Sequence, residues 1–165
     1  PHLDALKAHL IDEYNALIVE PYEADDLVVA AHDLYADSVL IGIDKDNLQS
    51  SGWHFNFNKG ELFNVDTFQA EYNLACQLLT GDSGDNIPGI DGVGPKTAEK
   101  ILNSTKSPID TAFQYYKQNG HSDKYFIEQL TLLKMRKDIY VPFSGYFVEL
   151  PELVSDVAYE FDNLD

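Results

Sequence analysis

Apolar residues recur at helical spacing in two N-terminal segments, and short apolar runs separate these segments. In residues 3–15, leucine and isoleucine recur every three to four positions, which predicts an amphipathic helix. The same spacing predicts a second helix over residues 22–36. The apolar runs at 16–20 and 38–43 predict two buried strands. Because helices and strands alternate, the pattern predicts an α/β fold with a parallel sheet, whose functional groups gather where the strands end.

The pattern changes further along the chain, from alternation to helices joined by glycine-rich turns. Residues 53–64 alternate loosely around a glycine and predict a hairpin or an edge strand. A helix is predicted over 66–79, with Asp66 or Thr67 as its cap. Three further helices are predicted beyond it, over residues 95–103, 108–118 and 122–137. We therefore predict three parts: an α/β core over 1–79, a helical lobe over 80–145 and an acidic tail over 146–165.

The composition limits the class of protein. The 165 residues are 44% hydrophobic and 12% aromatic, which is typical of a globular chain, and no apolar run is long enough to span a membrane. The single cysteine, Cys76, excludes an internal disulfide and a multi-cysteine zinc site, and it fits a reducing compartment. The net charge of −17 argues mildly against a nucleic-acid partner, unless many of the acids share a metal site.

Carboxylates gather in three groups, after each predicted strand and before the helical lobe. The groups are Glu23, Asp25 and Asp26; Asp44 and Asp46; and Asp82 and Asp85. Taken singly, they have ordinary explanations: helix-dipole partners for the first, a capped turn for the second and Asx turns for the third. Taken together, with no histidine or cysteine beside them, they indicate oxygen ligands for two Mg²⁺ or Mn²⁺ ions. Two such ions, ~3.5–4 Å apart, support phosphodiester hydrolysis.

The stretch GVGPKTAEKIL combines a tight turn with a basic helix. Gly92 and Gly94 permit the turn, and Pro95 suits the first helical position. The start of the helix then offers free N–H groups to an anion. Lys96 and Lys100 are four residues apart and share one helical face. This pattern predicts a helix-hairpin-helix grip on a DNA phosphate that is independent of base sequence.

The motifs EADD, DKD and GDSGDNIPGIDGVGPKTAEKIL, in this order and spacing, resemble the flap endonuclease and 5′-3′ exonuclease family. The similarity covers roughly residues 3–145 and is most specific between Thr80 and Leu102. It implies a PIN-like α/β nuclease core, a helix-three-turn-helix DNA clamp and Mg²⁺-dependent cleavage of 5′ ends, flaps and RNA primers in the cytoplasm of a bacterial or phage-infected cell. The seven acids match the family's metal-site residues. The family's clamp, which binds a phosphodiester and often K⁺, matches Gly92, Val93, Gly94, Lys96 and Thr97.

Part of the family's pattern has no counterpart in this sequence. The family's first strand with a catalytic aspartate, a second aspartate and a basic helical arch all lie upstream of the region that matches Pro1. The sequence therefore predicts weak or no cleavage by this chain alone, and either a fragment or a second chain that supplies the front. It also leaves open a non-catalytic DNA-junction binding module, one half of a split nuclease and, as a weaker alternative, a phosphatase-like metal hydrolase.

Overall fold

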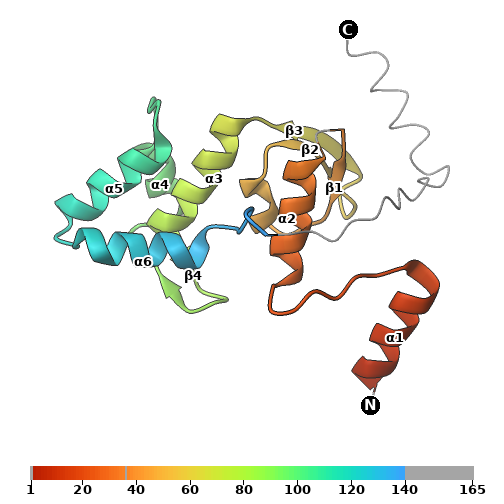
Figure 1. The fold of residues 1–165 in the computed structure, drawn as a ribbon. Coiled ribbons are helices and arrows are strands. Elements are labelled where there is room, and N and C mark those ends of the chain that lie inside the picture. Colours follow the sequence, from red (N-terminus) through yellow and green to blue (C-terminus); the bar gives the residue numbers. More distant parts are fainter. Residues whose placement is uncertain (1, 36, 140–165) are drawn as a thin grey trace, which may run out of the picture.

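The computed structural model describes residues 2–35 and 37–139, which form a small sheet region and a helical lobe joined by a central helix (Figure 1). The helices are α1 His2–Tyr14, α2 Ala24–Leu34, α3 Thr67–Thr80, α4 Pro95–Ile101, α5 Pro108–Gln118 and α6 Asp123–Leu133, with a 3₁₀ helix η1 Asp46–Gln49. The strands are β1 Val39–Ile41, β2 Gly52–Asn56, β3 Glu61–Val65, β4 Gly81–Asp82 and β5 Ile87–Pro88. In the described part of the chain, no helix is long and apolar enough to cross a membrane. The predicted acidic tail, 146–165, lies outside the described residues.

The main sheet has the strand order β1-β2-β3 and is mixed. β1 pairs with β2 in parallel, with Leu40 opposite His54, and the crossover between them runs through η1. β2 and β3 form the predicted hairpin, with Trp53 opposite Asn64. The short turn over residues 57–60 allows only an antiparallel return, which is why the sheet is not parallel throughout.

The strand predicted over residues 16–20 is wrong. The stretch 15–19 has no regular secondary structure, and Leu17 and Ile18 are each 53% exposed. A strand needs the backbone groups of a neighbouring strand to pair with, and an apolar run alone does not supply them. β1 lies at the edge of the sheet and pairs with β2 alone among the described strands.

The predicted first helix is present as α1, but it buries none of its side chains. Its apolar positions, such as Leu3, Leu6 and Leu10, are exposed, and Figure 1 shows the helix set apart from the sheet region and the lobe. It ends at Tyr14, and the next residue, Asn15, has a φ of 53°, which places it in the left-handed region. The amide of Asn15 donates to the carbonyl of Ile11 (3.1 Å), which closes the helix with a left-handed (αL) cap.

The largest apolar core lies in the helical lobe, between α3, α4, α5 and α6. Of the two predicted caps of α3, Asp66 and Thr67, the structure has Asp66, whose carboxylate accepts from the amide of Gln69 (2.7 Å). α6 ends at Leu133, earlier than predicted, because the backbone becomes extended at Lys134. That extended segment returns to the sheet region, where Met135 packs with Val29 and Leu40. α3 therefore contributes to the lobe core, although the predicted boundary places it in the nuclease core.

Candidate metal centre and nucleic-acid interface

The loop that carries Asp82 and Asp85 is held by two closely packed glycines. Gly81 has a φ of +74°, and a Cβ atom on it would lie 2.3 Å from the backbone nitrogen of Gly89. A Cβ atom on Gly89 would meet the backbone at the end of α3 at the same distance. Only glycine fits these two positions, so the β4–β5 hairpin folds directly against α3. Within the loop, the Asp82 Oδ1 atom accepts from the amide of Gly84 (2.8 Å), which is the Asx turn expected from the sequence.

Two of the three predicted acid groups meet in space. Asp46 from η1 and Asp82 and Asp85 from the β4–β5 loop each offer a carboxylate oxygen, and these oxygens all lie within 4.8 Å of one another. Asp82 is buried, Asp46 is half-buried and Asp85 is exposed, so the group opens to solvent on one side. Three carboxylate oxygens at this spacing can bind one hard divalent cation.

Asp44 acts electrostatically on Asp46 in this group, and Asp25 is coupled in turn to Asp44. The Asp44 Oδ1 atom accepts from the amide of Asp46 (3.0 Å), which is the capped turn expected after β1. Burial raises the pKa of Asp25, and the charges of Asp44 and Asp26 raise it further. The repulsion connects the first acid group to the second, and a bound cation would relieve it.

Glu23 and Asp26 are placed differently. Glu23 is exposed at the N-cap position of α2, and its side chain makes no capping hydrogen bond. The Asp26 Oδ1 atom accepts from the backbone amide of Arg136 (2.8 Å), so this carboxylate helps to hold the segment that follows α6. Neither residue is among the three carboxylates that lie within 4.8 Å of one another. Their predicted metal-site role stays a prediction.

Lys45 forms an ion pair with the acid cluster. Its Nζ atom lies 2.7 Å from the Asp82 Oδ2 atom, although the lysine side chain is 58% exposed. This hydrogen bond, together with the amide of Gly84, lowers the pKa of Asp82 and keeps the carboxylate ionised. For Asp46 the direction is opposite, because burial raises its pKa while a hydrogen bond from Gln77 offsets part of that effect.

Gln77 is a site residue that the sequence reasoning missed. Its Nε2 atom donates to the Asp46 Oδ1 atom, and its Oε1 atom accepts from Gln49 (2.6 Å). Both glutamines are buried. The available signal was a polar residue within the apolar stripe of α3, where Gln77 stands between Cys76 and Leu78.

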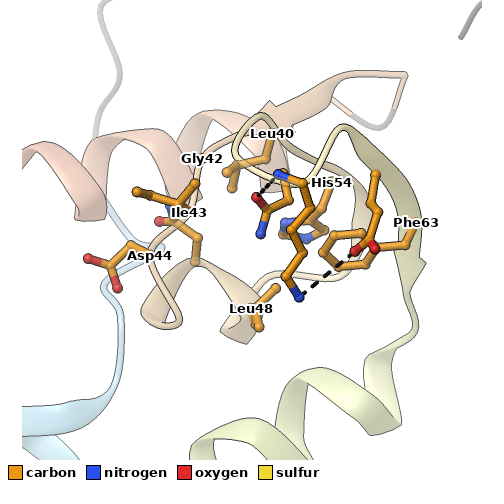
Figure 2. Close-up of a pocket in the computed structure, with 11 residues that line it drawn as sticks. Leu40, Gly42, Ile43, Asp44, Leu48, His54 and Phe63 are labelled. Atoms are coloured by element: carbon orange, nitrogen blue, oxygen red, sulfur yellow. Dashed lines mark hydrogen bonds and ion pairs between the residues drawn. The ribbon is translucent and has the colours of Figure 1, made fainter.

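A pocket of about 300 Å³ lies next to Asp44, which forms part of its lining. Its wall includes His54 and Phe63, whose rings stack with their centroids 5.7 Å apart. Figure 2 shows Asp44 at the edge of the pocket, with its carboxylate turned away from these two rings. The pocket therefore leaves the Asp44 carboxylate accessible and does not enclose it.

The predicted clamp loop forms a tight turn that leads into α4. Gly92 has a φ of +76°, and the buried Val93 closes the turn with its amide on the carbonyl of Ile90 (3.0 Å). Lys96 and Lys100 are both exposed on α4, as their spacing predicts. The amide of Thr97, which is half-buried, donates back to the carbonyl of Gly94 (2.9 Å) and begins the helix.

Nothing in this fold requires a glycine at position 94. Its φ of −95° and ψ of 177° are extended angles that any residue adopts, and a Cβ atom on it would have no neighbour within 4 Å. The space beside its backbone, at the start of α4, is therefore open on the outside of the lobe. A molecule that approaches this backbone closely would find room there.

The chain matches parts of curated nucleases. No family model matches it. It is 33% identical over 98 residues to the flap endonuclease Xni of Shewanella amazonensis, which covers 52% of this chain and 39% of that protein. It is 35% identical over 96 residues to the DNA polymerase I of Rhizobium leguminosarum, which covers 50% of this chain and 9% of the polymerase. The chain therefore spans less than half the length of either relative.

Two solved structures share its fold. A T5 5′-exonuclease mutant aligns over 81% of this chain and 65% of that chain, with a TM-score of 0.62 and 18% identity. A T5 protein co-crystallised with metal ions aligns over 98% of this chain and 67% of that chain, with a TM-score of 0.58 and 18% identity. These similarities confirm the predicted PIN-like α/β fold with its helical lobe.

Proposed function

We propose that this chain, which is homologous to the flap endonuclease and 5′-3′ exonuclease family, is part of a structure-specific 5′ nuclease that hydrolyses DNA or RNA-primer phosphodiesters. One observation carries the proposal. Asp46 and the pair Asp82 and Asp85 come from segments far apart in the sequence, yet their oxygens lie within 4.8 Å of one another. An ordinary capped turn or Asx turn explains each segment separately, but neither explains why the carboxylates meet.

The donor set fits Mg²⁺ or Mn²⁺. Asp46, Asp82 and Asp85 would hold one ion, and Asp44 and Asp25 would extend the site toward a second, with Glu23 and Asp26 around it. Bound ions of this kind activate a water molecule and stabilise negative charge on the phosphate. The Lys45 Nζ atom, 2.7 Å from the Asp82 Oδ2 atom, keeps that carboxylate ionised. Because the lysine side chain is exposed, it could also turn toward a substrate phosphate.

The helical lobe would grip the DNA backbone. We propose that the backbone at Gly92, Val93 and Gly94 faces a phosphate, where a K⁺ ion would bridge the two, and that Lys96, Thr97 and Lys100 flank it. The open space beside Gly94 supports this, because a substrate backbone needs such room. The two exposed lysines supply a local basic surface on a chain whose net charge is −17.

The metal centre is tested by calorimetric titration of the chain with Mn²⁺. We expect binding by the wild type, and Asp82→Asn or Asp46→Asn should weaken it by at least tenfold, roughly the loss of one charge-assisted ligand. Asp12→Asn, an exposed acid on α1, is the matched control and should leave the affinity unchanged. A wild-type chain that binds no Mn²⁺ would rule out the metal centre.

Activity is tested with a labelled 5′-flap DNA in the presence of Mg²⁺ or Mn²⁺. The chain spans only 39% of the flap endonuclease it matches, so we expect weak or no cleavage by this chain alone. Robust turnover would show that it needs no further part.

The same partial coverage of the relatives favours a second candidate function, a DNA-junction binding module or one half of a split nuclease. Gel-shift binding without cleavage supports the module, and cleavage restored by a second chain supports the split enzyme. The cytoplasmic location stays a prediction.

A further inference from the structure

The geometry points to Gln77 as a positioning residue that orients the carboxylate of Asp46, with Gln49 fixing the direction of the Gln77 amide. This inference rests on the proposed metal centre. Gln77 lies on α3 and Gln49 at the end of η1, and their side chains are only 8% and 6% exposed. The ion would be held by Asp46, Asp82 and Asp85, so neither glutamine would be a metal ligand.

Gln49 is held in one orientation by backbone groups. Its Nε2 atom donates to the carbonyl of Leu133 (2.8 Å), and its Oε1 atom accepts from the amide of Met135 (3.0 Å). A backbone carbonyl only accepts and a backbone amide only donates, so a flipped Gln49 would lose both bonds. The segment that leaves α6 thus determines which way the Gln49 amide points.

The fixed direction of Gln49 passes to Gln77. The second hydrogen on the Gln49 Nε2 atom points to the Gln77 Oε1 atom (2.6 Å), so Gln77 has to present its oxygen to Gln49. Its Nε2 atom then faces the Asp46 Oδ1 atom and donates to it. In this chain of hydrogen bonds each group therefore donates to the next, from the Met135 amide after α6 through Gln49 and Gln77 to Asp46.

The last hydrogen bond restricts what the Asp46 carboxylate can do. With a donor fixed on its Oδ1 atom, the carboxylate cannot rotate freely, and its remaining lone pairs stay available toward Asp82 and Asp85. Groups that hydrogen-bond metal-binding side chains in this way typically change metal affinity by about 10–100-fold. A purely structural glutamine pair would stabilise the fold without affecting ion binding.

The test compares Mn²⁺ affinity between the wild type and Gln77→Met, which has similar length and no donor. We expect Gln77→Met to weaken Mn²⁺ binding by at least about tenfold. Gln69→Met is the matched control, because Gln69 also lies on α3 and its Nε2 atom donates to Asn73 (3.0 Å) on the exposed side. This control should bind Mn²⁺ like the wild type. In the background of Asp46→Asn, Gln77→Met should have little further effect.

A second measurement uses the unmodified chain, in case Gln77→Met does not fold. We expect the side-chain amide resonances of Gln77 to shift in NMR spectra on titration with Mg²⁺, while those of Gln69 stay in place. Equal Mn²⁺ affinity of wild type and a folded Gln77→Met, or Gln77 resonances unmoved by Mg²⁺ that binds, would overturn this inference and leave the metal centre standing. A wild type that binds neither ion would overturn both.

Discussion

The helical lobe and the sheet region of this chain are stabilised in different ways. The lobe buries one continuous apolar cluster, in which Leu78 and Tyr116 are fully buried. Among the described residues, the sheet region has only small apolar clusters, such as Val29 with Leu40 and Met135. Large apolar side chains remain exposed over residues 2–57: Leu3, Leu6, Leu10, Ile11, Tyr14, Leu17, Ile18, Val28, Leu34, Ile41, Ile43 and Phe57.

Besides the packing of Met135, several hydrogen bonds hold the sheet region against the lobe. Gln49 bonds to the backbone on both sides of Lys134, and Asn73 of α3 donates to the carbonyl of Leu48 (2.8 Å). These bonds are directional, so they fix the position of η1 more sharply than apolar contacts would. The acid cluster lies between η1, which these hydrogen bonds position, and the β4–β5 loop, which follows α3 of the apolar lobe. We infer that the lobe supplies rigidity and the hydrogen bonds supply alignment.

The largest effect that separates the two regions should come from Leu78→Ala. Leu78 is fully buried in the lobe, so its truncation leaves a cavity and should lower the free energy of unfolding by about 2–5 kcal/mol. Phe57→Ala, at a 55% exposed position on the β2–β3 turn of the sheet region, should change it by less than about 1 kcal/mol. Urea unfolding followed by circular dichroism measures both. Similar losses for the two variants would contradict the contrast between the regions.

A smaller loss is expected from Tyr116→Phe, which removes one buried hydroxyl. This hydroxyl donates to the Leu78 carbonyl (2.5 Å), one of the last carbonyls of α3 and without a helical partner of its own. Leaving that carbonyl without a donor should lower the free energy of unfolding by about 1–3 kcal/mol. Burial raises the pKa of Tyr116 to about 12, so its absorbance should titrate late. Tyr14→Phe, at an exposed site, is the control and should have no measurable effect.

The sequence was a good guide to the lobe, because there each helix finds its apolar partners within the chain. The helix over 108–118, with Pro108 at its start, was predicted as the structure has it, and of the two predicted caps, Asp66 and Thr67, the structure has Asp66. The prediction failed at 16–20, where the apolar run is real but pairs with none of the described strands. It also extended the last helix to 137, because no local signal shows that Met135 returns to pack on Val29.

The acid cluster was predictable only in part. The order of strands and loops indicated that Asp46 would meet Asp82 and Asp85, and the structure brings these three together. Asp26 could not be placed from sequence, because its partner, the amide of Arg136, is 110 residues away. The role of Gln77 depends on a hydrogen bond across 31 positions, which no local pattern predicts.

The sheet region should also be the acid-sensitive part of the chain, because it buries His32 and His54 with ring centroids 5.1 Å apart. Ser38 donates its hydroxyl hydrogen to Tyr35 (2.6 Å), so the His32 Nδ1 atom donates to Ser38 (2.8 Å). The His32 Nε2 atom is then left unprotonated, buried and without a hydrogen-bond partner.

Burial lowers the pKa of both histidines below 6.5; for His32 the neighbouring His54 and Lys137 lower it further, while Asp33 opposes them. The unfolded chain therefore binds more protons as the pH falls through about 6.5, and stability that is fully present above this value is lost below it. Replacing both histidines by glutamine should flatten the dependence of unfolding free energy on pH between 7.5 and about 5.5. His9→Gln, at an exposed site, should leave the slope as it is, and an unchanged slope in the double variant would refute the assignment.

The smallest effect tests how the ion pair between Lys45 and Asp82 influences metal binding. Lys45 lies 2.7 Å from Asp82, but the lysine side chain is 58% exposed, so solvent screens the pair and it contributes less than about 1 kcal/mol to stability. A bound cation would compete with Lys45 for the same carboxylate. We therefore expect Lys45→Met to bind Mn²⁺ more tightly by up to about fivefold at low salt, and by less at high salt. Lys59→Met, which removes a weaker pair with Glu61 (3.9 Å) on the β2–β3 turn, should not change the affinity. Weaker Mn²⁺ binding by Lys45→Met would mean that the lysine holds Asp82 in place for the ion and does not compete with it.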